Sequence, residues 1–79
     1  MKHARDDYNR IQDPEGKIPE DEPVFLIRGQ DVAAPATLRA YALLAHERGA
    51  NRDIVDAVLD HVRLMEDWQR MAACKVPDL

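Results

Sequence analysis

Arg28, Gly29, Gln30 and Asp31 bring together, at four consecutive positions, side chains suited to binding a small anionic ligand. An arginine holds a phosphate or a carboxylate through two parallel hydrogen bonds. Glutamine and aspartate offer donors and acceptors to the edge of a base or a sugar, and a glycine lets a ligand approach the backbone closely. We therefore predict a ligand-binding loop at residues 28–31, with Arg39 extending its basic side.

The same loop also has a purely structural interpretation, which stays open at this point. Arg28 can pair with an acidic side chain of the N-terminal segment, Gln30 can face solvent, and Asp31 can cap the helix that follows. In favour of ligand binding, a helix start offers free amides and a partial positive charge to an anion.

Patterns that indicate catalysis or metal binding are missing from the sequence. The chain has no serine, and its single threonine, Thr37, has no histidine at catalytic spacing, which excludes a Ser/His/Asp triad. Cys74 is the single cysteine, so neither an intrachain disulfide nor a CxxC metal site can form. His46 and His61 do not form an HExxH motif. We predict no enzymatic activity, no metal site and no cofactor.

The charge balance and hydropathy limit the partners of the chain. With 11 basic and 15 acidic residues, its net charge of −4 lacks the basic excess that duplex nucleic acid binding requires. No apolar run approaches the ~18 residues of a membrane span, and the N-terminus lacks the apolar region of a secretion signal. We expect a cytoplasmic protein that contacts neither duplex nucleic acid nor membrane, in agreement with its low cysteine content.

Residues 1–23 are predicted to be an irregular, acidic, proline-rich arm. They carry 4 basic and 7 acidic side chains. The run Asp13-Pro14-Glu15-Gly16 has the residues of a type I turn. The arm either packs on the domain or on a neighbouring subunit through its few apolar side chains, or it is a solvated tail.

Residues 24–79 are predicted to form one domain that begins with a short strand. The run Val24-Phe25-Leu26-Ile27 lies between Pro23 and Gly29 and is typical of a buried strand, with Phe25 in the core. No second run of this kind follows, so the partner must be the arm or the same strand of another copy. An extended segment that packs on helices without a ladder is the alternative.

Two helices are predicted after this strand. Pro35 fits the first turn of a helix that runs through Leu38, Tyr41, Ala42 and Ala45 and stops at Gly49. Asn51 is a good N-cap for a second helix. Because only Gly49 and Ala50 separate the two helices, they must be antiparallel neighbours.

The second helix has more apolar surface than one partner helix can cover. One predicted stripe has coiled-coil spacing and a second lies beside it. A small chain needs extra burial, so we expect homo-oligomerisation through the strand and this helix, although one domain using both stripes internally is the alternative. The coiled-coil stripe contains Ile54, Val58, His61, Met65, Trp68 and Ala72, and the second contains Val55, Leu59 and Val62.

Residues 22–31, with the sequence E-P-V-F-L-I-R-G-Q-D, are followed by A-P-A at 34–36 and L-R-A-Y-A at 38–42. Together with the region of Trp68 and the run K-V-P-D at 75–78, this pattern resembles a family of short proteins found in bacteria and their phages. The resemblance implies a phage accessory protein in the host cytoplasm. Such proteins block host functions or immune signalling, either by clamping a host protein or by sequestering a nucleotide messenger in an oligomer.

The sequence thus predicts a mostly helical α+β fold, in which a short N-terminal strand is followed by an antiparallel two-helix hairpin and completed by homo-oligomerisation. The leading functional hypothesis is a non-enzymatic binding protein, anti-defence in role, that sequesters a small anionic or nucleotide ligand at subunit boundaries. Its site residues are Arg28, Gly29, Gln30, Asp31 and Arg39. The alternative is an inhibitor or adaptor that binds a host protein and no small molecule.

Overall fold

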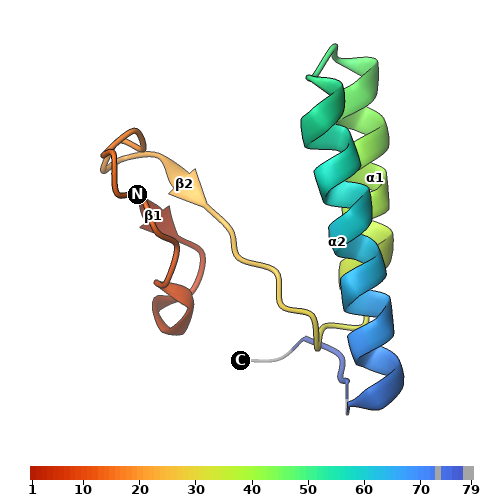
Figure 1. Ribbon diagram of the computed structural model, residues 1–79. Coiled ribbons are helices and arrows are strands. Elements are labelled where there is room, and N and C mark those ends of the chain that lie inside the picture. The colour runs from red at the N-terminus through yellow and green to blue at the C-terminus, as the bar shows by residue number, and fades with distance from the viewer. Residues whose placement is uncertain (73, 78–79) are drawn as a thin grey trace.

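The computed structural model describes residues 1–72 and 74–77 of the chain (Figure 1). Its largest elements are two α-helices, α1 (Ala34–Glu47) and α2 (Arg52–Met71). Before them come strand β1 (Lys2–His3), the 3₁₀ helix η1 (Asp6–Tyr8) and strand β2 (Pro23–Val24). The fold is therefore mostly helical with a small two-stranded sheet, which confirms the predicted class at this level. Residues 73 and 78–79 of the predicted 24–79 domain, including the last residue of the K-V-P-D run, lie outside the described residues.

Local signals define the start of α1 and both ends of the short connection from α1 to α2. Pro35 lies in the first turn of α1, where its missing amide hydrogen costs nothing. Gly49 follows α1 with a φ of 85°, a left-handed conformation that favours glycine. The Asn51 side chain accepts a hydrogen bond of 2.8 Å from the amide of Asp53 and so caps α2. These parts of the sequence prediction are confirmed.

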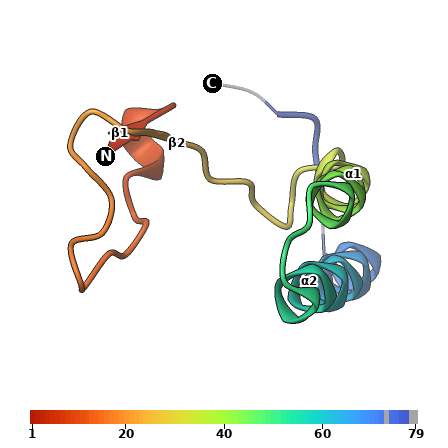
Figure 2. The same cartoon turned by 90° about the horizontal axis from the view of Figure 1, so that it is seen from above.

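The two helices lie side by side and are joined at one end by the turn at residues 48–51 (Figures 1 and 2). Among the described residues, few apolar side chains are fully buried, and most of those are small. Val62, at 1% exposure, is the largest of them below 2%. The buried apolar residues of the two helices are Ala34, Pro35 and Ala42 from α1 and Val55, Val62 and Met65 from α2.

The structure corrects the predicted faces of α2. The side facing α1 follows the spacing 55, 58, 62, 65 and 69, whereas the predicted coiled-coil stripe mixed this side with the opposite one. Several apolar patterns at three- and four-residue spacing fit the sequence of α2, and contact with α1 selects one of them. A second regular row, which we call the outward stripe, is exposed to solvent. It contains Ile54, Ala57, His61, Leu64, Trp68 and Met71.

The predicted buried strand at 24–27 is wrong in its extent. β2 pairs in parallel with β1, so its partner is the N-terminal arm, and the ladder ends at Val24. After β1 the chain turns into η1 at Asp6, so β1 cannot pair with the residues that follow Val24. Phe25 is 70% exposed and does not belong to the core of this chain.

The elements of residues 2–24, which we call the N-terminal lobe, stand apart from the helices in both views (Figures 1 and 2). An extended segment leads from β2 across to the start of α1. After α2, the backbone of Lys75 lies beside residues 30–32. No helix in the described part of the chain is both long and apolar enough to cross a membrane.

Candidate functional site

The predicted ligand-binding loop is a turn between the extended segment and α1. The amide of Asp31 donates a hydrogen bond of 3.1 Å to the carbonyl oxygen of Arg28. The segment after α2 holds the turn from one side, because the amide of Lys75 donates to the carbonyl of Gln30 at 2.9 Å and the amide of Val32 donates to the carbonyl of Lys75 at 3.1 Å. The loop is therefore fixed by backbone contacts.

A side chain from α2 holds the loop from the other side. Nε2 of Gln69 donates to the carbonyl oxygens of Gly29 at 2.8 Å and Asp31 at 2.9 Å. The sequence analysis missed this residue. The sequence did contain a signal for it. The row of residues on the α1-facing side of α2 continues from Val62 and Met65 to position 69, where a polar residue follows apolar ones. A polar side chain on a buried face usually has a hydrogen-bond partner.

Arg28 is exposed, and its side chain makes no ion pair with any described residue. Its guanidinium carbon lies 5.9 Å from the centre of the Tyr8 ring, and that of Arg5 lies 4.3 Å from the same ring. Arg5 also forms an ion pair of 2.8 Å with Asp7 and so lowers the pKa of that carboxyl group, to which the charge of Arg28 makes a smaller contribution. The arm thus supplies a ring, but no ion-pair partner, to Arg28.

Two hollows flank the loop, and Arg28 and Gln30 line both. The first, of about 60 Å³, lies toward the N-terminal lobe and is also lined by Tyr8, Asp31 and Lys75.

The second hollow, which we call the α2 groove, is larger and more open. It lies between residues 27–30 and the α2 residues His61, Leu64, Met65 and Trp68, and its volume is about 360 Å³. His61, Leu64 and Trp68 belong to the outward stripe. The groove therefore joins the predicted loop to the exposed face of the helix.

Asp31 caps the chain just before α1. Its Oδ1 accepts a hydrogen bond of 2.8 Å from the amide of Ala33, and its carbonyl accepts one of 3.0 Å from Ala34. The amide of Thr37 donates to Ala33, and Pro35 has no amide hydrogen. Most amides at this helix start are thus already bonded, so the expected anion site on free helix amides is not formed.

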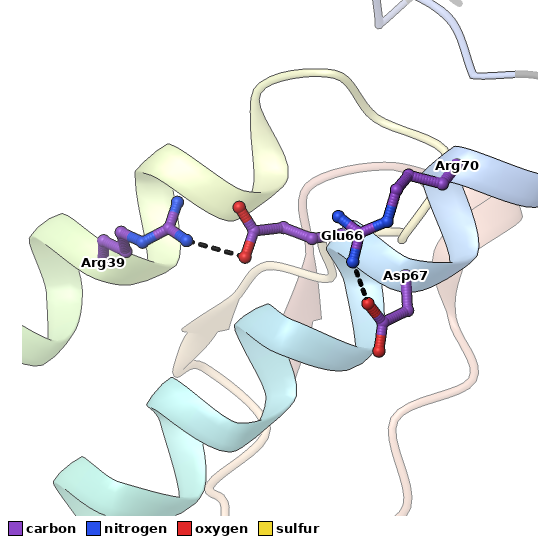
Figure 3. Close-up of polar contacts among 4 residues, drawn as sticks. All are labelled: Arg39, Glu66, Asp67 and Arg70. Carbon is purple, nitrogen blue, oxygen red and sulfur yellow. Dashed lines mark hydrogen bonds and ion pairs between the residues drawn. The ribbon is translucent and has the colours of Figure 1, made fainter.

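Arg39 is placed away from the loop. It forms an ion pair of 2.7 Å with Glu66 of α2, next to a second pair between Asp67 and Arg70 (Figure 3). The bond from Arg39 lowers the pKa of Glu66 below its ordinary value. The structure therefore brings Arg28, Gly29, Gln30 and Asp31 together, while Arg39 joins the two helices.

The described residues contain no group of three or more histidine, cysteine or acidic side chains that could hold a metal ion. Comparison with family models, with curated proteins and with solved structures finds no match to this chain. The functional argument therefore depends on the loop and its two hollows.

Proposed function

We propose that this chain is a non-enzymatic, homo-oligomeric binding protein that holds a small anionic ligand, with a nucleotide as the leading candidate, at the loop formed by Arg28–Asp31. The observation that carries this proposal is the placement of Arg28 beside two hollows, where its side chain has no ion pair with the described residues. Arg28 lines both hollows beside the loop and forms no ion pair in the described part of the chain, and its loop is held by Gln69 and Lys75. Because the backbone of the loop is fixed, only the side chain of Arg28 loses conformational freedom when it binds an anion.

The surface area supports self-association. The structure exposes 6336 Å², whereas a folded monomer of 9.0 kDa exposes about 4,850 Å². The excess of roughly 1,500 Å² is larger than the ~800 Å² that each partner contributes to a standard interface. In this proposal the helices form an antiparallel hairpin, and further copies complete the fold by covering the outward stripe of α2.

The location of the α2 groove connects these two parts of the proposal. Because His61 and Trp68 belong both to the groove and to the outward stripe, a second copy on that stripe would form the open wall of the groove. A ligand there would lie at a subunit boundary. Together with the resemblance of the chain to short phage and bacterial proteins, this location supports an accessory protein that sequesters a host signal in the cytoplasm. Neither duplex nucleic acid nor membrane takes part in the proposal.

The test is a titration with adenosine 5′-monophosphate (AMP), followed by calorimetry, on the wild-type chain and two variants. Arg28→Ala removes the proposed contact, and Arg48→Ala, at the exposed turn between the helices, is the matched control. A hydrogen bond to a charged group contributes about 1.5–3 kcal/mol, so Arg28→Ala should weaken binding about 10- to 150-fold while its melting curve stays normal. Equal affinities for the two variants would exclude the loop as the site. Native mass spectrometry of protein purified from cells then reports the subunit number and any retained ligand.

A second candidate function is an inhibitor or adaptor that binds a host protein. The specific observation in its favour is the outward stripe, an exposed apolar row flanked by the ion pairs Asp60–Arg63 and Asp67–Arg70. In that case the stripe would be covered by the host protein, the purified chain would be a monomer, and Arg28→Ala would leave its biological effect intact.

A further inference from the structure

The α2 groove is lined by three polar side chains that make no hydrogen bond or ion pair in the described part of the chain. Arg28 and Gln30 come from the loop and His61 comes from α2. None of the three side chains makes a hydrogen bond or ion pair there. By contrast, the backbone that carries Gln30 is bonded to Lys75, so the loop that presents these groups is fixed. The groove thus offers polar groups that a ligand can use.

The α2 side of the groove is apolar and aromatic. Trp68 is 45% exposed, so its indole ring is partly accessible, and Leu64 and Met65 lie beside it in the lining. Flat rings stack on exposed indole rings, and the binding energy is nearly independent of which ring is stacked. An anion alone would use Arg28 but leave this wall uncovered.

We propose that the α2 groove takes an anion joined to a flat aromatic ring, and that His61 adds a second positive charge to the site at acidic pH. This inference rests on the proposed function and specifies its ligand class and its pH dependence. Arg28 holds the anion at every pH, because a guanidinium stays charged. The ring lies on the wall formed by Trp68.

The sign of the pH effect follows from the charges around His61. Arg28 is the charged residue that lines the groove from the other element, and Asp60 and Arg63, the charged neighbours on α2, form an ion pair of 3.6 Å with each other. An imidazole changes its charge between about pH 5 and 8. An anion that lies between His61 and Arg28 is attracted by both side chains only when the imidazole carries its proton. Affinity for an anion therefore rises as the pH falls.

The test compares two phosphodiesters, 3′,5′-cyclic AMP, which has a ring, and dimethyl phosphate, which has none. Diesters are used because the second ionisation of a phosphate monoester, near pH 6, would overlap with that of an imidazole. Trp68 is the single tryptophan of the chain, so its fluorescence reports directly on the groove. Cyclic AMP should quench this fluorescence and bind at least about fivefold more tightly than dimethyl phosphate.

The pH dependence is tested with His61→Gln. His46→Gln, on the exposed face of α1, is the matched control. Between about pH 8 and pH 5.5 the affinity for cyclic AMP should rise about fivefold in the wild-type chain and in His46→Gln, and stay constant in His61→Gln. Equal binding of the two phosphodiesters, or the same rise in His61→Gln, overturns this inference. If Arg28→Ala still weakens AMP binding in that event, the proposed function stands; if Arg28→Ala has no effect, both fall.

Discussion

The side chain of Gln69 donates a hydrogen bond of 2.8 Å to the carbonyl oxygen of Gly29, which lies 40 positions earlier in the chain. A second bond of 2.9 Å from the same nitrogen reaches Asp31. Because Arg28 precedes these two carbonyls, its position depends on a residue of α2. The loop and α2 are therefore held together as one structural unit.

Replacing Gln69 by alanine should loosen the loop. The two carbonyl oxygens are part-buried and would lose their shared donor, at a cost of about 1–3 kcal/mol. We expect a lower melting temperature and faster hydrogen exchange at the amides of Asp31 and Val32. Gln12→Ala, at an exposed position of the N-terminal lobe, is the control. Identical melting of the two variants would show that the bonds from Gln69 contribute no stability.

The contact between the helices depends on Val62. Its side chain is 1% exposed, so Val62→Asp buries an unpaired charge between α1 and α2 and should unfold the chain. Leu64→Asp, two residues later but 61% exposed, should stay folded. Circular dichroism distinguishes the two variants. A helical spectrum with normal melting for Val62→Asp would contradict the assignment of the inward face.

Self-association should depend on the outward stripe. Light scattering at micromolar concentration should give the mass of at least two chains for the wild type, and a mass near 9.0 kDa for Leu64→Asp. Leu44→Asp makes the same change on α1 at 56% exposure and should keep the larger mass. A wild-type chain that is monomeric and stable on dilution would refute the predicted oligomer.

The ion pair between Arg39 and Glu66 should give a pH-dependent contribution to stability. A carboxyl group whose pKa is lowered on folding stabilises the protein above its unfolded pKa of about 4.3, and this stabilisation is lost as the pH falls through the folded pKa. Glu66→Gln should therefore melt below the wild type at neutral pH and together with it in strong acid. Asp60→Asn, in an exposed pair within α2, should change the melting temperature little at either pH. If the melting temperatures of Glu66→Gln and the wild type differ by the same amount at both pH values, the variant has lost packing and not the ion pair.

The helices could be predicted because their signals are local. Pro35, Gly49 and Asn51 each act within one helical turn of the position that they define. The length of strand β2 could not be predicted, because it depends on where the pairing strand β1 ends. Val24 pairs with His3, and nothing at 24–27 shows that the arm turns away at Asp6.

The residues of the candidate site also divide into those that local sequence predicts and those that depend on contacts between distant parts of the chain. The grouping of Arg28 with Gln30 follows from adjacency in the sequence and was predicted. Arg39 was expected to extend the basic side of the loop from the first helix, whereas its side chain instead forms an ion pair with Glu66, 27 positions later. The contributions of Gln69, His61 and Trp68 depend on how α2 passes the loop, which the order of residues does not define.

The two-stranded sheet also has a consequence for the order in which the chain folds. Its strands join residues 21 positions apart, whereas α1 and α2 are linked by a short turn and pack as neighbours. Local contacts form early, while closing a longer loop costs more chain entropy and takes place later. The loop around Arg28 needs both Gln69 from a completed α2 and the backbone at Lys75, which is near the end of the described chain. We therefore expect it to be among the last parts of the molecule to acquire its shape during folding.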